Sequence, residues 1–559
     1  MIKFLAGIRG QEIVEKIYSQ EQDNDNEDNI IHSRLFLAAE CLAEVREARR
    51  ELKEEINQKL KELIRIEPFR FDAIIASGFL GDITSLKSLL WDLDSRVRAA
   101  AVKALAVFKD RVPEEVIKAI AGLLRDDEWY VRAAAVDALA VFKDRLPEEV
   151  IKDIAGWLRD VNWKVRAAAV DALVKLEDRV PEEAIKDIAA RLRDGDWRVR
   201  AAAVDALAVF KDRLPEEVIK DIAGRLRDDD WDVRATAVKA LAKLGDRLPE
   251  EVIKDIAARL RDDNRLVRKA AVDALAKLED RVSEEVIKDI AARLQDDKWL
   301  VRAAAVDALA VFNDRVSEEA IKDIAGLLHD DNSDVRAAAV KALAVFKDRV
   351  PGEAIEDIAA RLRDDKWEVR AAAVEALAVF NDRVPGEAIM DIAARLRDDN
   401  WEVRKAAVDA LAKLGDRIPE EVLKDIAARL RDDNRLVRAA AVDALAVFKD
   451  RVPEEAIKDI AGLLHDDNRL VRAVAAKALA VFKDRVPEEA IKDIAGLLHD
   501  DDSDVRAVAA KALAVFKDRV PEEVIMDIAG WLRDDNWEVR ESAYRTLKIF
   551  YESGIPLPG

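Results

Sequence analysis

Apolar residues recur along this chain with the period of a helix. In 147–158 they fall at the i, i+1, i+4, i+5 and i+8 positions of an amphipathic helix, as Val150, Ile151, Ile154, Ala155 and Leu158. Pro147 suits the first helical position, because no amide partner is lost there. The spacing predicts a helix over 147–158, which we call helix A.

A second helical pattern lies before it, over 129–142, and is called helix B. Its apolar face consists of Val131, Ala134, Ala135, Ala138, Leu139 and Phe142. Asp126 or Asp127 stands just ahead and is expected to cap the first free amides of helix B. Residues 143–146 then form the turn into helix A.

This helix pair is one unit of a repeat. The dipeptide Val-Arg recurs fourteen times from Val97-Arg98 to Val539-Arg540, always 34 residues apart. Two short helices cannot bury their apolar faces alone, so each pair must stack on its neighbours. The period therefore predicts an all-α solenoid of tandem 34-residue helix pairs over 91–545.

The linker between the helices resembles a known family. An Asp followed five residues later by Val and six later by Arg, as in Asp126, Val131 and Arg132, is similar to the HEAT repeat family, including the arrays of phycobilisome-lyase type. The resemblance implies a right-handed α-solenoid with helix B on its concave side. It also implies a structural ladder between adjacent units, made by Asp126, Arg132, Asp160, Arg166, Asp194 and Arg200.

Differences between the copies point to a binding surface. The position of Trp129 holds Trp, Arg or Ser, and a buried core position would not accept such changes freely. Positions 129, 133, 137 and 141 are four apart and form one stripe on helix B. Since exposed Trp and Arg dominate binding hot spots, we expect this stripe to bind a partner. The residues concerned are Trp129, Trp163, Trp197, Trp231, Trp299, Trp367, Trp401, Trp537, Arg265, Arg435 and Arg469.

A second interpretation of the stripe remains open. Exposed positions vary when nothing constrains them, and each Trp could pack over the turn of the next unit. Under that interpretation the tryptophans stabilise the array and contact no partner.

Charge and composition narrow the class of partner. The net charge of −21 disfavours nucleic acid and anionic membranes, although a local basic stripe is compatible with it. No apolar run reaches the length of about 20 residues that spans a bilayer. The single cysteine, Cys41, excludes a disulfide framework within the chain. We expect a cytoplasmic protein with a protein partner.

Catalytic motifs are missing from the sequence. There is no G-x-x-x-x-G-K-[ST] phosphate loop and no G-x-S-x-G elbow. His329, His465 and His499 each stand where most copies have Arg, and they are too far apart to share one metal ion. We therefore expect no enzyme, no metal and no cofactor.

The two ends differ from the repeats. Residues 1–90 are predicted to form a helical cap or adaptor, and 546–559 a C-terminal tail. The passage 32–44 and the segment 2–7 resemble part of bacterial NACHT proteins of the STAND class. That resemblance implies the sensor half of a signalling or defence NTPase, with any nucleotidase on an upstream part or another chain. A bilin-lyase-like subunit and a trimmed or engineered repeat scaffold are the alternatives.

Overall fold

The computed structural model describes residues 83–516, 519–533, 537–552 and 554, together with single residues between 55 and 76. The predicted module over 1–90, with Cys41 and the NACHT-like passage, therefore lies mostly outside the described residues. The predicted tail over 546–559 lies partly outside them. Every element of the described part is a helix, and this part contains no strand. The all-α fold class predicted from the sequence is confirmed.

Contacts divide the chain into two units, residues 1–281 and 282–559. The helices of the first unit are α6 (Ile83–Leu86), α7 (Ser95–Val107), α8 (Glu114–Gly122), α9 (Trp129–Val141), α10 (Glu148–Gly156), α11 (Trp163–Lys175), α12 (Glu182–Ala190), α13 (Trp197–Val209), α14 (Glu216–Gly224), α15 (Trp231–Leu244), α16 (Glu250–Ala258) and α17 (Arg265–Lys277).

The second unit continues the same alternation. Its helices are α18 (Glu284–Ala291), α19 (Trp299–Phe312), α20 (Glu318–Gly326), α21 (Ser333–Phe346), α22 (Gly352–Ala360), α23 (Trp367–Phe380), α24 (Gly386–Ala394), α25 (Trp401–Leu414), α26 (Glu420–Ala428), α27 (Arg435–Phe448), α28 (Glu454–Gly462), α29 (Arg469–Phe482), α30 (Glu488–Gly496), α31 (Ser503–Phe516), α32 (Glu522–Trp531) and α33 (Trp537–Glu552).

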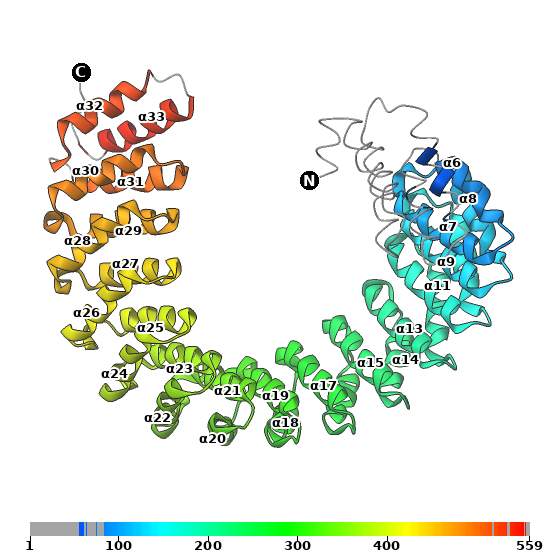
Figure 1. Ribbon diagram of the computed structural model, residues 1–559. Helices are drawn as coiled ribbons and strands as arrows, with labels where there is room; N and C mark the ends of the chain where they lie inside the picture. The colour runs from blue at the N-terminus through cyan, green and yellow to red at the C-terminus, as the bar shows by residue number, and fades with distance from the viewer. Residues whose placement is uncertain are drawn as a thin grey trace, which may run out of the picture. The chain divides into compact units, whose positions relative to one another are not determined.

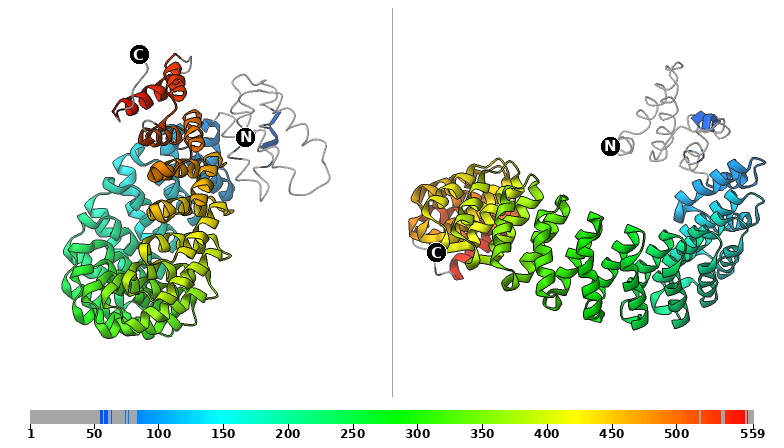
Figure 2. Two further views of the ribbon diagram at one scale, coloured as in Figure 1. Left: turned by 90° about the vertical axis from the view of Figure 1, so that its left-hand side faces the viewer. Right: turned by 90° about the horizontal axis from the view of Figure 1, so that it is seen from below.

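Within each unit the helices form two layers. The odd-numbered helices from α7 on correspond to helix B, and each packs against the odd-numbered helices of the neighbouring repeats. The even-numbered helices from α8 on correspond to helix A and form the other layer (Figure 1). Both views in Figure 2 show consecutive pairs side by side in chain order. The stack of helix pairs expected from the 34-residue period is present in both units.

The core lies between the two layers. Val131 and Leu139 of α9 are fully buried, as is Ile154 of α10, and Leu158 just after α10 is buried with them. These side chains belong to the apolar faces predicted from the sequence. Removing them from water supplies most of the stability of such a stack, at roughly 1.5–3 kcal/mol for each large side chain.

Short 3₁₀ turns end the helices. Helix A stops at Gly156 and continues as a 3₁₀ turn, η5 (Trp157–Arg159), so it is shorter than the predicted 147–158. Helix B is followed by η4 (Lys143–Arg145), whose first residue has a φ of +32°. The same position has φ +50° in Gly245 and φ +56° in Gly415. Glycine adopts this backbone conformation without steric cost, whereas lysine is strained in it.

The caps differ from the prediction. Pro147 is the N-cap of α10, with ψ 148°, and not its first helical residue. In α11 the N-cap lies two places after the linker Asp, and Asn162 Oδ1 accepts the Lys164 N–H at 2.9 Å. The carboxylate of Asp160 accepts the N–H of that cap residue instead. The N-cap of α9 is Glu128, which makes no side-chain cap hydrogen bond, so neither Asp126 nor Asp127 caps this helix.

Candidate partner-binding surface

The predicted stripe lies on one face of each odd-numbered helix. In α9 the stripe consists of Trp129, Ala133, Asp137 and Val141, and we call the equivalent residues of all odd-numbered helices the helix-B stripe. Trp129 and Ala133 are half-buried, whereas Asp137 and Val141 are exposed. In α9 the middle and the C-terminal end of the stripe are therefore accessible. Trp129 packs with part of its side chain and exposes the rest.

The predicted partner-binding residues differ in exposure. Trp231, Trp299 and Trp537 are exposed, at 41%, 44% and 62%. The arginines at the same repeat position are also exposed, namely Arg265, Arg435 and Arg469. The half-buried members are Trp129, Trp163, Trp197, Trp367 and Trp401. Each of these five side chains can therefore pack within the array and also contact a partner.

Three of the tryptophans are joined by cations of the chain itself. Lys164 Nζ lies 4.4 Å from the ring centroid of Trp129 and 5.7 Å from that of Trp163. Arg198 Cζ lies 4.6 Å from the ring centroid of Trp163 and 4.7 Å from that of Trp197. Each such contact contributes about 0.5–2 kcal/mol, depending on exposure. The structure thus brings Trp129, Trp163 and Trp197 into one row of alternating rings and cations.

Carboxylates occupy the middle of the stripe in the first unit. Asp137 and Asp171 stand at equivalent positions of α9 and α11. Partial burial between neighbouring helices raises the pKa of Asp137 and of Asp171, although Lys175 acts in the opposite direction on both. Both side chains are nevertheless exposed, and the lysine beside them offsets part of this effect.

The Arg and Asp of the linker connect adjacent repeats. Arg132 donates from Nε to Asp160 Oδ2 at 2.8 Å and from Nη1 to the Asp126 carbonyl oxygen at 2.8 Å. The next step joins Arg166 to Asp194 at 2.6 Å, and the following one joins Arg200 to Asp228 at 2.6 Å. These side chains are buried or nearly so, and each arginine spans two repeats.

The electrostatics of this ladder favour its charged form. Burial by itself would raise the pKa of Asp194, but the hydrogen bonds from Arg166 and from the Asp196 N–H outweigh it, and the pKa lies below its ordinary value. The hydrogen bond to Asp228 raises the pKa of Arg200. The ladder groups are already satisfied by one another, so they are poorly suited to bind a ligand.

A second set of arginines was missed in the sequence. Arg485, in the turn after α29, donates from Nη1 to the Lys449 carbonyl oxygen at 3.0 Å and from Nη2 to the Val452 carbonyl oxygen. Arg417 likewise donates to the Val384 carbonyl oxygen at 2.6 Å. These turn arginines satisfy carbonyl groups of the preceding repeat. The recurrence of Arg in every turn is the sequence feature that could have indicated these contacts.

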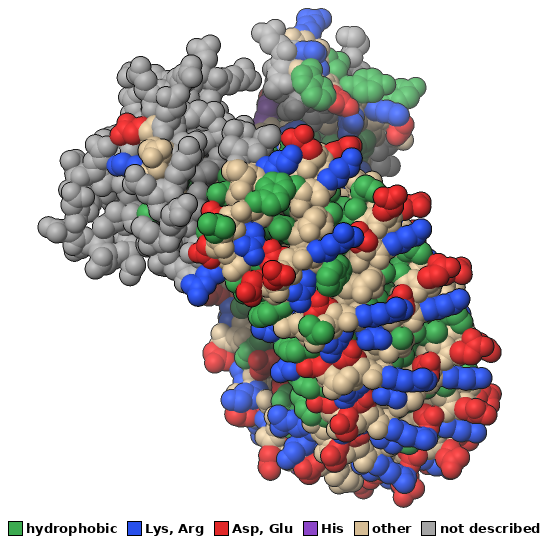
Figure 3. All heavy atoms as spheres, turned by 90° about the vertical axis from the view of Figure 1, so that its right-hand side faces the viewer, with side chains coloured by type: hydrophobic (Ala, Val, Ile, Leu, Met, Phe, Trp, Pro, Cys, Tyr) green, Lys and Arg blue, Asp and Glu red, His purple; other side chains and the backbone are tan. Residues whose placement is uncertain are grey.

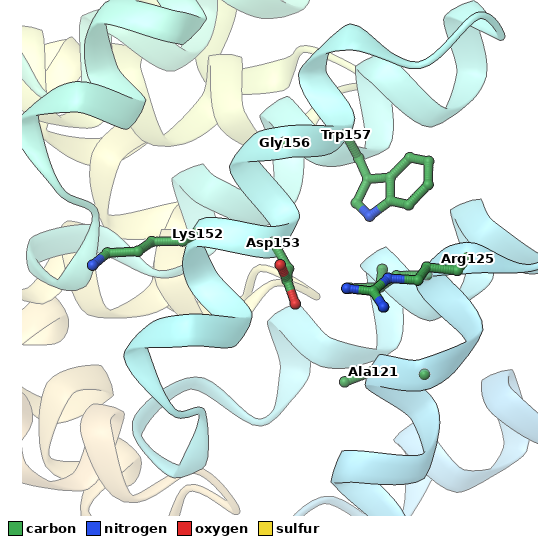
Figure 4. A pocket seen from close by; sticks show the side chains of 8 residues that line it. Ala121, Arg125, Lys152, Asp153, Gly156 and Trp157 are labelled. Carbon is green, nitrogen blue, oxygen red and sulfur yellow. The ribbon is translucent and has the colours of Figure 1, made fainter.

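Trp157 was also not singled out by the sequence analysis. It stands where Arg191 and other copies have arginine, and Arg132 Cζ lies 5.7 Å from its ring centroid. Its indole lines a hollow of about 530 Å³ beside Arg125 and Asp153 (Figure 4). This hollow lies beside the helix-A layer, since Asp153 belongs to α10.

Two neighbouring hollows lie along the helix-B starts of the second unit. One, of about 510 Å³, is lined by Trp401, Arg435 and Leu436 among others. The other, of about 420 Å³, is lined by Arg435, Leu436, Arg469 and Leu470. Arg469 is held by Asp502 at 2.5 Å. Apolar, cationic and acidic side chains thus line the two hollows at this part of the stripe.

Other faces carry mixed charge. Figure 3 shows Lys and Arg side chains alternating with Asp and Glu side chains in rows across one face. Exposed pairs between repeats include Arg159 with Asp187 at 2.9 Å and Arg193 with Asp221 at 3.0 Å. His329 takes the place of such an arginine, 3.7 Å from Asp357. Exposed pairs of this kind contribute about 0–1 kcal/mol each.

The described residues contain no group of His, Cys, Asp and Glu side chains arranged to hold a metal ion. No helix among them is long and apolar enough to cross a membrane.

Comparison with known proteins identifies the repeat. A family model described as HEAT repeats matches overlapping segments that together cover 83–555: 83–174, 117–208, 151–232, 185–276, 219–310, 253–344, 287–378, 355–446, 423–514 and 494–555. No curated protein matches the sequence.

Among solved structures, Kap95p from a study of its binding to RanGDP is similar at a TM-score of 0.76, with 14% identity, 99% of this chain and 85% of that chain covered. Importin beta matches at 0.68, with 14% identity and coverage of 99% and 86%. Karyopherin Kap121p bound to the extreme C-terminus of the phosphatase Cdc14p matches at 0.57, with 13% identity and coverage of 96% and 70%. At such identities these likenesses concern the fold alone. The HEAT model covers most of the chain, and the protein therefore belongs to the family of HEAT repeats.

Proposed function

We propose that this protein is a non-enzymatic scaffold that binds a protein partner along the helix-B stripe. The observation that carries the proposal is the exposure of large apolar and cationic side chains at one repeat position, including Trp231, Trp299 and Arg435. Aromatic and arginine side chains dominate binding hot spots. A row of such side chains, exposed at equivalent positions on one face, indicates an interaction surface.

The solved structures support the same proposal. Karyopherin Kap121p, whose fold this chain shares, is described in complexes with Cdc14p and with the protease Ulp1p. These partners are proteins. By analogy of fold, a partner that lies along several repeats would contact several copies of the stripe at once.

The test is a comparison of three forms of the full chain as bait in a lysate of the organism that encodes it. They are the natural chain, a Trp163→Ala, Trp197→Ala, Trp231→Ala variant, and a control variant with Lys152→Ala, Lys186→Ala and Lys220→Ala. The control lysines are exposed on helices of the other layer. All three forms should give the same helical circular dichroism spectrum.

We expect a protein that is retained by the natural chain and by the control but lost from the tryptophan variant. Retention by all three forms would mean that the stripe does not bind the partner. If no protein distinguishes the natural chain from the tryptophan variant, the tryptophans serve packing and the proposal is wrong.

We further propose that the scaffold is the sensor of a bacterial signalling or defence NTPase. This step rests on the sequence resemblance of 32–44 to NACHT proteins alone. Its test is whether nucleotide hydrolysis by an NTPase encoded beside this chain changes when the partner found above is added. Unchanged hydrolysis would leave the scaffold without a role in such a switch.

A further inference from the structure

The space between consecutive tryptophans of the helix-B stripe accepts a cation. At two places in the first unit a cation that follows a Trp fills it: Arg198 lies between Trp163 and Trp197, with its Cζ 4.6 Å and 4.7 Å from the two ring centroids. Lys164 does the same between Trp129 and Trp163. Side chains of the chain itself therefore show that this space binds a cation.

The second unit has the same two rings without the cation. α23 and α25 begin at Trp367 and Trp401, the same repeat position as Trp163 and Trp197. The residue that corresponds to Arg198 is Glu402, and that which corresponds to Lys164 is Glu368. In the part of the chain that the structure describes, neither carboxylate forms an ion pair, and both are exposed.

The surroundings add negative charge. Asp365 and Asp399 each give one oxygen to a ladder arginine, Arg336 at 2.9 Å and Arg370 at 2.8 Å, yet their side chains are 70% and 91% exposed. Asp334 of α21 is exposed beside them in the repeat before.

Two nearby lysines of the chain are already engaged, and Arg435 of the next repeat lines a hollow beside Trp401. Lys366 Nζ lies 3.5 Å from Asp365, and Lys405 Nζ lies 2.7 Å from Asp409. Among the described residues, Glu368 and Glu402 therefore remain exposed carboxylates without an ion pair beside Trp367 and Trp401. A cation that enters from outside would gain two ring faces and at least one unpaired carboxylate.

We infer that the surface formed by Trp367, Glu368, Trp401 and Glu402 binds a basic segment of a protein partner. A Lys or Arg side chain of that segment lies between the two indoles, where Arg198 lies in the first unit, and its charge is balanced by Glu402. Further Lys or Arg side chains meet Asp365 and Asp399 at the rim. The space between Trp129 and Trp163 and the space between Trp163 and Trp197 do not bind this segment in the same way, because Lys164 and Arg198 occupy them.

The inference deepens the proposed function and rests on it. It is tested on the full chain with a short fluorescent peptide that alternates lysine with serine, and with a glutamate–serine peptide of equal length, by fluorescence anisotropy. Carbodiimide, which joins a peptide amine to a carboxylate in contact with it, then locates the bound lysine peptide by mass spectrometry.

Glu402→Arg copies Arg198 into the second unit and should fill the space there. We expect it to raise the Kd of the lysine peptide about tenfold or more, as expected for losing a cation–π contact together with a carboxylate. Glu353→Arg is the matched control: it makes the same change of charge on an exposed residue of α22, in the other layer, and should change the Kd less than about twofold.

The reverse change should create a site. Arg198→Glu empties the space between Trp163 and Trp197, so the double variant Arg198→Glu, Glu402→Arg should regain binding of the lysine peptide. The carbodiimide product should then move from Glu402 in the natural chain to the new carboxylate at 198.

Equal effects of Glu402→Arg and Glu353→Arg would overturn the inference, because binding would then depend on net charge alone. Absence of binding by the lysine peptide, or equal binding of the glutamate peptide, would overturn it as well. If the tryptophan variant of the first unit loses its natural partner while Glu402→Arg changes nothing, the proposed function stands and this inference fails.

Discussion

Two ion pairs in the same two repeats allow a direct measure of what burial contributes to the linkage between repeats. Arg370 pairs with Asp398 at 2.7 Å, and Arg363 pairs with Asp391 at 2.8 Å. Both pairs join residues 28 apart. The side chains of the first pair are 10% and 2% exposed, and those of the second are 71% and 35% exposed. Distance and sequence separation match, whereas exposure and the number of hydrogen bonds differ: Arg370 donates two hydrogen bonds to Asp398, and Arg363 donates one to Asp391.

We expect the buried pair to couple far more strongly. Removing Arg370 leaves the buried Asp398 with only the longer contact to Arg395, at 3.5 Å, which should cost up to about 3–5 kcal/mol. In a double-mutant cycle with Arg370→Ala and Asp398→Ala, the coupling energy should be about 1.5–3 kcal/mol, as found for hydrogen bonds between charged groups. The same cycle with Arg363→Ala and Asp391→Ala should give about 0.2–1 kcal/mol.

Hydrogen exchange read by mass spectrometry suits this measurement, because each repeat contacts only its neighbours and opens locally. The free energy of opening is taken from amides of α23 and α25 in the four members of each cycle. Amides of α29 serve as an internal reference and should not change. Coupling energies of the two pairs that agree within about 0.5 kcal/mol would refute the reasoning, since burial and the second hydrogen bond would then contribute nothing.

Two further predictions concern the whole chain. Lys347 has a φ of +46° at the position of Gly415, so Lys347→Gly should raise the stability to urea by about 1 kcal/mol and Gly415→Lys should lower it by a similar amount; equal midpoints for all three proteins would mean that the turn stores no strain. Acid should destabilise the chain. The folded-state pKa of Asp194, like that of Asp398, lies below the unfolded value of about 3.9. This stability is present above pH 4 to 5 and is lost as the pH falls through the folded pKa, which circular dichroism at 222 nm would follow. Asp171 acts in the opposite sense, since its pKa is raised; a helical signal that persists unchanged to pH 2 would contradict the prediction.

The repeat made most of the fold predictable. A constant period and an amphipathic spacing fix which residues face the core, so helix B was predicted over 129–142 and is observed over Trp129–Val141. The caps were predicted wrongly because the Asp that precedes helix B binds two groups at once, the arginine of the preceding repeat and a backbone N–H. Only the structure shows that this carboxylate lies close enough to the arginine of the preceding repeat to accept its hydrogen bonds.

The candidate surface was less predictable for a similar reason. The spacing places Trp129, Trp163 and Trp197 on one face, but it does not show that Lys164 and Arg198 lie between their rings. The sequence predicts the turns but not the contacts of turn arginines such as Arg485. Their acceptors are carbonyl groups 33 and 36 residues earlier in the chain. Every residue carries a backbone carbonyl group, so these contacts leave no pattern in the residue types at the acceptor positions.

The direction of these arginine contacts bears on how the array can change in length. The linker arginine reaches forward, as Arg132 does to Asp160, and the turn arginine reaches back, as Arg179 does to the Leu146 carbonyl oxygen. Every 34-residue copy therefore carries an arginine donor and a matching acceptor for the copy before it and for the copy after it. Gain or loss of a whole copy by gene duplication or deletion joins a complete set of donors to a complete set of acceptors at the new junction. Any other change of length would leave a buried Asp without its arginine, so selection would retain whole copies and keep their length constant.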